Sequence, residues 1–194
     1  MLSTMPKPRI LGGTAKGREL ETPPSGTRPS PSRLREALFD VLAFEPRGRF
    51  LDLFSGSGAI GLEAASRGWE ATCVELAGKA AEVIRRNAAR LKLPVTVVKD
   101  DALAYSHANP GAFKVLFAAP PYPDDLGHIF ATLLASGAVA PGGLYVLQHP
   151  TAMQIPSLPT ALEGAEVRVK RYGTNSVTLV RVPAASEPPA PADS

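Results

Sequence analysis

Apolar positions along this chain follow two periodicities in turn, and their order predicts the order of strands and helices. Short apolar runs, typical of buried strands, are separated by longer segments in which apolar residues recur every three or four positions, as in helices. The strands are expected in residues 49–54, 70–76, 95–100, 113–119, 143–149, 165–170 and 176–182, and the helices in 59–68, 78–93 and 126–136. Another helix should begin at a cap formed by Ser32, because Leu34, Leu38 and Val41 follow helical spacing.

This alternation of strands and helices predicts the fold class. Strands separated by helices pair in parallel through right-handed crossovers. We therefore expect an α/β fold with an open, mostly parallel, Rossmann-like sheet and helices on both faces. The last two strands are joined only by a short turn around YGTN, so they should form an antiparallel hairpin at the sheet edge.

Composition divides the chain into one folded domain and two different ends. A chain of 194 residues with 44% hydrophobic residues can build one sizeable core. Residues 1–31 are expected to form a basic N-terminal extension with a short strand or hairpin, residues 32–182 the folded domain, and the proline-rich residues 183–194 a disordered tail. We find no membrane-spanning run and no secretory h-region, which predicts a cytoplasmic protein without a membrane partner.

Basic residues are concentrated near the N-terminus. Residues 1–35 hold seven lysines and arginines against two acids, whereas the whole chain has a net charge of +3. Such a segment can contact a polyanion, because phosphate contacts release counterions; a solvated arm without a partner is the alternative. The single cysteine, Cys73, lies in an apolar run and should be a buried thiol. The three scattered histidines, His107, His128 and His149, predict no metal site.

A glycine-rich loop follows the first strand of the sheet in LDLFSGSGAIG. Gly56, Gly58 and Gly61 fit the G-x-G-x-x-G pattern between a strand and a helix, which is typical of dinucleotide sites. Asp52 argues against a dinucleotide, because a carboxylate before the loop would repel a pyrophosphate. A cationic ligand such as S-adenosylmethionine fits better, and the glycines let its methionine part approach the backbone.

Two more acids follow the next two strands, and ligands of open α/β sheets bind at the carboxyl ends of strands. Glu75 can accept hydrogen bonds from ribose hydroxyls, as it would also do for NAD. Asp101 can accept from an adenine amino group, with Ala102 as a nearby backbone donor. Each acid alone could be a solvated strand end or a helix cap, but three acids around one loop favour S-adenosylmethionine.

Three segments carry a resemblance to a known family. DLFSGSGAIGLEA resembles the donor loop of class I S-adenosylmethionine-dependent methyltransferases, and PPY in VLFAAPPYPDDL resembles the D/N-P-P-Y/F motif of those that methylate exocyclic amines. The N-terminal RILGGTAKGREL and the following TRPSPSRLREALFDVL are similar to the start of the RsmD family, which methylates the 2-amino group of a guanine in bacterial small-subunit ribosomal RNA. The resemblance runs from about Arg9 to about His149.

The resemblance implies a role for each matching residue. Asp52, Ser55, Gly56, Gly58 and Gly61 would surround the methionine moiety of the cofactor, Glu75 its ribose, and Asp101 with Ala102 its adenine. Pro120, Pro121 and Tyr122 would form the amine-receiving site, although two prolines can also simply end a strand. The RNA backbone would be contacted by Arg9, Lys16, Arg18, Arg28, Arg33 and Arg35. Arg35 could instead pair with Glu36 on the helix.

One position departs from the family pattern: the residue before the two prolines, usually Asp or Asn, is Ala119. An aromatic amine is a poor nucleophile, and hydrogen bonds from its NH2 to a side-chain oxygen and to a proline carbonyl would aim its lone pair at the methyl group. Ala119 cannot accept such a bond. Either the Pro120 carbonyl and stacking by Tyr122 suffice, or Asp124 or Asp125 replaces the acceptor, or the chain binds RNA and cofactor without transferring a methyl group.

The sequence therefore predicts a methyltransferase that moves a methyl group from S-adenosylmethionine to the 2-amino group of a guanine in 16S, small-subunit ribosomal RNA by direct displacement. Ribosomal RNA or the small ribosomal subunit is the expected partner, and we expect a monomer. One alternative is a DNA amino-methyltransferase, for which 194 residues leave little room for a target-recognition region. The other is a non-catalytic RNA-binding assembly factor that retains the cofactor pocket.

Overall fold

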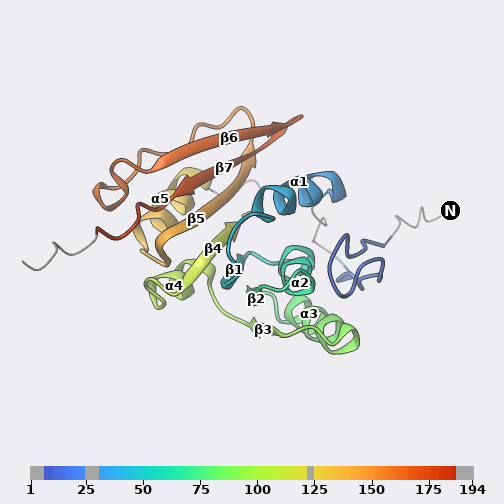
Figure 1. The fold of residues 1–194 in the computed structure, drawn as a ribbon. Coiled ribbons are helices and arrows are strands. Elements are labelled where there is room, and N and C mark those ends of the chain that lie inside the picture. Colours follow the sequence, from blue (N-terminus) through green and yellow to red (C-terminus); the bar gives the residue numbers. More distant parts are fainter. Residues whose placement is uncertain (1–6, 25–30, 122–124, 187–194) are drawn as a thin grey trace, which may run out of the picture.

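Seven strands form one mixed sheet in the part of the chain that the computed structural model describes, residues 7–24, 31–121 and 125–186 (Figure 1). The strands are β1 (Arg49–Leu53), β2 (Glu70–Val74), β3 (Val95–Val98), β4 (Phe113–Ala118), β5 (Val139–Pro150), β6 (Glu166–Tyr172) and β7 (Asn175–Arg181). The helices are α1 (Ser32–Leu42), α2 (Ala59–Ser66), α3 (Gly78–Leu91), α4 (Ala102–His107) and α5 (Leu126–Ala135), with a 3-10 turn over Thr160–Leu162.

The strand order is β3-β2-β1-β4-β5-β7-β6. The strands β1 to β5 pair in parallel, and β7 pairs antiparallel with both β5 and β6. The turn between β6 and β7 contains Gly173 at φ 64°, a backbone angle that favours glycine. The mostly parallel sheet and the antiparallel C-terminal hairpin are both confirmed.

Helices cover both faces of the sheet. Successive residues of a strand point to opposite faces, and the central strands carry apolar residues on both of them. On one face, Phe117 of β4 and Val146 of β5 belong to a core that includes residues of α1, α2 and α3. On the other face, Leu116 and Leu147 belong to a core built with α4 and α5. Each strand of the sheet centre is therefore buried on both sides.

The basic N-terminal segment packs against the domain. Arg9 and Glu19 form an antiparallel β-bridge, as the expected short strand pair requires, and Ile10 and Leu20 are buried. Hydrogen bonds attach the segment to α2, where the Ala15 amide donates to Ser66 Oγ at 2.9 Å, and to α3 through Asn87 and Glu21. These contacts hold the polypeptide that leads into the cleft described below.

Some local predictions need correction. Ser32 does not cap α1: it is the first residue of the helix, which follows Pro31 and has no side-chain cap. The fifth strand begins at Val139, four residues before the predicted start, and its pairing with β4 is irregular between Phe113 and Val115. The short helix α4 is an addition to the predicted elements. Within the described ranges, no helix is long and apolar enough to cross a membrane.

Candidate active site

A cleft of about 1270 Å³ opens at the carboxyl ends of β1 to β5. The residues of the predicted site that line it are Asp52, Ser55, Gly56, Glu75, Asp101, Ala102, Ala119, Pro120 and Pro121. Its volume exceeds the roughly 300–1,000 Å³ of a typical small-molecule site. The two halves of the predicted chemistry, the acids after β1 to β3 and the prolines after β4, therefore share one cavity.

Asp52 is buried at the end of β1, with 1% of its surface exposed. Its Oδ2 accepts a hydrogen bond from the Gly61 amide at 3.0 Å, which fastens the start of α2 to the strand. Burial, with a smaller contribution from the nearby acid Glu75, raises the pKa of this carboxyl to about 7 against the lowering effect of the Gly61 amide. A cation entering the cleft would relieve the cost of ionising Asp52, so the residue suits a positively charged ligand.

The glycines of the loop have two different roles. Gly56 lines the cleft at φ 54°, whereas Gly58 and Gly61 are not among the lining residues. A Cβ on Gly58 would lie 2.8 Å from Cγ1 of Ile84, and a Cβ on Gly61 would lie 2.2 Å from Sγ of Cys73, which is buried as predicted. Gly58 and Gly61 therefore allow close packing of the loop and α2, and their contact with the ligand stays a prediction.

Hydrogen bonds inside the chain hold the other elements of this half of the cleft. Ser55 Oγ donates to the Asp52 carbonyl at 2.7 Å. Glu75 accepts from the amides of Gly56 and Ala77 at 2.7 and 2.9 Å, so that its carboxylate bridges the loops after β1 and β2. Asp101 caps α4 by accepting from the Ala104 amide at 2.8 Å. A carboxylate offers about four acceptor positions, so these acids keep capacity for a ligand.

The edge after β4 is built differently. Ala119 is partly buried, Pro120 is buried and Pro121 is exposed, and all three line the cleft. Asp125, one candidate for the missing acceptor, caps α5 by accepting from the His128 amide at 3.0 Å and is not among the lining residues. Asp125 therefore has one carboxylate oxygen committed to the helix cap, and its role as the acceptor stays a prediction. Tyr122 and Asp124 lie outside the described residues.

The cleft also contains residues that the sequence interpretation missed. Residues Pro23, Pro24, Pro31, Phe54, Ile129, Gln148 and Asn175 are among those that line it. The proline positions bring the N-terminal segment to the cleft. Gln148 follows the apolar run of β5, near the carboxyl end of that strand. Because ligands of open α/β sheets bind at the carboxyl ends of strands, Gln148 could have been identified from the sequence in the same way as the three acids.

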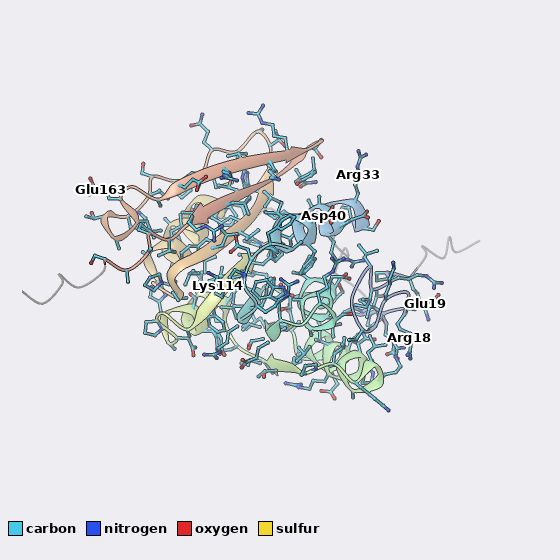
Figure 2. All side chains as sticks on the ribbon, in the orientation of Figure 1. Arg18, Glu19, Arg33, Asp40, Lys114 and Glu163 are labelled. Atoms are coloured by element: carbon cyan, nitrogen blue, oxygen red, sulfur yellow. The ribbon has the colours of Figure 1, made fainter. Side chains whose placement is uncertain are left out.

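The cations predicted to contact RNA separate into groups. Lys16, Arg18 and Arg33 are exposed, and Figure 2 shows Arg18 on the N-terminal segment and Arg33 on α1. Arg9 is exposed but forms an ion pair with Glu19 at 2.5 Å. Arg28 lies outside the described residues. The exposed cations of the first group are those available to a phosphate.

Arg35 is removed from the RNA candidates by its burial, since only 1% of it is exposed. Its Nη2 donates to the Arg9 carbonyl at 2.7 Å, and its Nε lies 3.8 Å from Oε2 of Glu63. Glu63 also accepts from the amides of Leu11 and Gly12. Arg35 therefore helps hold the N-terminal segment on the domain, and its partner carboxylate is Glu63 where the sequence suggested Glu36.

Comparison with known proteins places the chain in a family. Residues 8–181 match the family model described as conserved hypothetical protein 95. The chain is 34% identical over 156 residues to ribosomal RNA small subunit methyltransferase D of Escherichia coli K12, covering 78% of this chain and 79% of that protein. It is 32% identical over 134 residues to the protein of the same name from Haemophilus influenzae, covering 65% of this chain and 69% of the relative.

A solved structure agrees with the family match. The structure of a hypothetical protein from Thermus thermophilus is 48% identical in sequence and superimposes with a TM-score of 0.77, covering 90% of this chain and 99% of that one. The sequence matches and this superposition both extend over most of the domain that carries the cleft. The chain therefore belongs to the RsmD family of S-adenosylmethionine-dependent methyltransferases, as the sequence resemblance predicted.

Proposed function

We propose that this protein transfers a methyl group from S-adenosylmethionine to the 2-amino group of a guanine in 16S ribosomal RNA. One observation carries the proposal: a single cleft joins three acids, after β1, β2 and β3, to the proline edge after β4. The curated relatives are named ribosomal RNA small subunit methyltransferases, which supports an RNA substrate of this class. The size of the cleft suits a cofactor together with a substrate base.

The residues present fit the cofactor. Asp52 is a buried acid with a raised pKa and would stabilise a nearby ammonium, while Glu75 would accept from the ribose hydroxyls and Asp101 from the adenine amine. When bound, S-adenosylmethionine supplies an electrophilic methyl group on a sulfonium, whose departure as a neutral thioether needs no acid. The acids of this chain would therefore bind and orient the cofactor, and none of them needs to donate a proton in the reaction.

The edge from Ala119 to Pro121 would receive the amine. Held there with its lone pair toward the methyl carbon, the guanine nitrogen forms the new N–C bond as the C–S bond breaks. The nitrogen then releases one proton to solvent, which is easy because a positively charged aromatic amine is acidic. This edge contributes by orientation, which can supply a large share of a rate enhancement when the reacting atoms are held in line.

The N-terminal segment would guide the RNA to this edge. Its exposed cations include Lys16 and Arg18, and two of its prolines, Pro23 and Pro24, line the cleft. Phosphates bound by the cations would leave a neighbouring base within reach of the cleft. Binding of this kind should weaken steeply with salt, because each phosphate contact releases counterions.

The test combines binding with product mapping. Calorimetry measures the affinity for S-adenosylmethionine, and transfer is then measured to naked 16S ribosomal RNA, to partly assembled small subunits and to DNA. The proposal expects methylated RNA in which a single guanine carries the new methyl group on its 2-amino nitrogen. Transfer to DNA alone would favour a DNA methyltransferase, and tight cofactor binding without transfer to any RNA would favour an assembly factor.

A further inference from the structure

The acceptor edge of the cleft lacks a side-chain oxygen on β4. Ala119 lines the cleft beside Pro120 and presents only a methyl group. Asp125 is engaged as the cap of α5. A side chain on the neighbouring strand β5 can supply the acceptor for the substrate amine instead.

The register of the sheet identifies the neighbouring position. Ala118 of β4 pairs in parallel with Leu147 of β5, so Ala119 and Gln148 each lie one residue beyond this pair. Phe117 and Val146 are also a pair and both belong to the core on the α1 to α3 face. Side chains two residues apart on a strand share a face, and adjacent strands are about 4.8 Å apart.

Gln148 therefore stands next to the gap left by Ala119, on the same side of the sheet, and it lines the same cleft. Its Oε1 is buried and has no hydrogen-bond partner among the described residues. Leaving a buried acceptor unsatisfied is unfavourable, because the oxygen loses its hydrogen bonds to water without a replacement. Such a group inside a binding cleft suits a donor that arrives with the ligand.

Neighbouring polar side chains at this end of the sheet are satisfied within the protein. His149 contacts Thr178 Oγ1 through Nε2 at 2.8 Å and the Pro150 carbonyl through Nδ1 at 2.9 Å. Thr151 Oγ1 lies 2.9 Å from Ser176 Oγ. The unsatisfied oxygen of Gln148 is thus a local feature of the cleft wall, and the β5 to β7 region does not generally leave polar groups unpaired.

We propose that Gln148 Oε1 accepts a hydrogen bond from the exocyclic amine of the substrate base and so replaces, from β5, the side-chain acceptor that Ala119 lacks on β4. The inference rests on the proposed function, because it names the residue that orients the amine in that reaction. No proton is removed by the amide. It fixes the nitrogen while the N–C bond forms, and the proton leaves afterwards to solvent.

The first test replaces Gln148 by leucine, which has a similar size and no acceptor. Gln148→Leu should lower kcat for ribosomal RNA methylation by about 10²-fold, the order seen when one oriented hydrogen-bonding group at a reacting centre is removed. The affinity for S-adenosylmethionine should stay within about twofold of the wild type. Gln154→Leu, the same change at an exposed position outside the cleft lining, is the matched control and should leave both values unchanged.

The second test asks whether position 119 and position 148 do the same task. Ala119→Asn adds an amide on the adjacent strand, so in the Gln148→Leu background it should recover about tenfold or more of the lost kcat, while changing the wild type by less than about threefold. Coupling of this size is expected for residues that share a partner, whereas independent positions would have additive effects. Thermal unfolding of every variant checks that the fold is retained.

The outcomes separate the inference from the function on which it depends. Full activity of Gln148→Leu on RNA that the wild type methylates would overturn the role of Gln148 and leave the proposed function intact. Loss of activity that Ala119→Asn fails to recover, with altered cofactor affinity, would also overturn it in favour of a structural role. A wild type that methylates no RNA would refute the proposed function and this inference together.

Discussion

The two halves of the cleft differ in how their polar groups are satisfied. In the half after β1, β2 and β3, each acid already accepts a backbone hydrogen bond: Asp52 from Gly61, Glu75 from Gly56 and Asp101 from Ala104. In the half after β4 and β5, Ala119 offers no polar side-chain atom and Gln148 has a buried oxygen without a partner in the described part of the chain.

This difference indicates that the two halves of the cleft have different tasks. The first half is held in place by hydrogen bonds within the chain, which would lower the ordering cost of binding a cofactor that is used in every turnover. Under the proposed function, the second half would leave its hydrogen-bonding capacity to the substrate, so that the correct base would complete the site and a base without the amine would leave a buried acceptor unpaired. Substitutions in the two halves of the cleft should therefore have different effects on stability, cofactor binding and methyl transfer.

Replacing the buried acid should change how stability depends on pH. Burial moves the pKa of Asp52 from 3.8 to about 7, so the folded state holds this proton more tightly than the unfolded state. The protonated Asp52 carboxyl therefore contributes to the free energy of unfolding below about pH 4, and this contribution is lost as the pH rises through 7. The loss amounts to about 4 kcal/mol, at 1.36 kcal/mol per pKa unit. Asp52→Asn should lack this loss, as urea unfolding at pH 4, 6 and 8 would show.

The same variant distinguishes stability from binding. At pH 8, Asp52→Asn should be more stable than the wild type without ligand, yet bind S-adenosylmethionine about tenfold more weakly or worse, a loss of about 1.4 kcal/mol. Parallel stability curves for the two proteins would contradict the buried, unpaired state of this carboxyl.

Filling the space at Gly61 should destabilise the domain. A Cβ there would lie 2.2 Å from Sγ of Cys73, so Gly61→Ala should lower the free energy of unfolding by about 1–3 kcal/mol, the usual cost of overpacking. Cys73→Ala removes the opposing sulfur, and the double variant should be more stable than the Gly61→Ala single variant in denaturant titrations. An additive loss would mean that the contact is relieved elsewhere.

Asp101 and Asp125 each cap a helix, so their substitutions can be compared directly. Asp101 caps α4 and lines the cleft, whereas Asp125 caps α5 and is not among the lining residues. Replacing either by alanine should cost about 1 kcal/mol of unfolding free energy. Only Asp101→Ala should also weaken S-adenosylmethionine binding, by about two- to tenfold. Weaker methyl transfer at full cofactor saturation in Asp125→Ala would restore Asp125 as an acceptor.

The smallest effect is expected at Ala119. Ala119→Asp places a carboxylate on the acceptor side, away from the backbone hydrogen bonds that hold the three acids. The dissociation constant for S-adenosylmethionine should therefore stay within about twofold of the wild type, and transfer should persist. Calorimetry measures the first and incorporation of labelled methyl the second. A tenfold weaker cofactor affinity would show that the two halves are not independent.

Motifs that bind through local geometry could be predicted from the sequence. The glycine loop, the acids at successive strand ends and the PPY segment are encoded in short stretches, and the topological rule for parallel sheets brings such strand ends together. The cleft lined by Asp52, Glu75, Asp101 and Pro120 agrees with that prediction. The family resemblance pointed to the same cleft.

Roles that depend on distant partners could not be predicted in this way. Arg35 looked like a surface cation on an amphipathic helix, but Glu63 on α2 lies within 3.8 Å and the pair is buried. Gly61 fits the glycine pattern of the loop, but that pattern does not reveal its close approach to Cys73 on β2. In each case, the deciding contact joins residues far apart in the chain.

The sequence by itself determined the order of the strands and of the helices other than α4, the identity of the family and the strand ends that carry the three acids, because periodicity and strand-end motifs are local properties. Only the tertiary structure decided which cations remain exposed and which polar group stands beside Ala119. The parallel register of β4 and β5 sets Gln148 next to that alanine, and register follows from packing between elements that no short stretch of sequence contains.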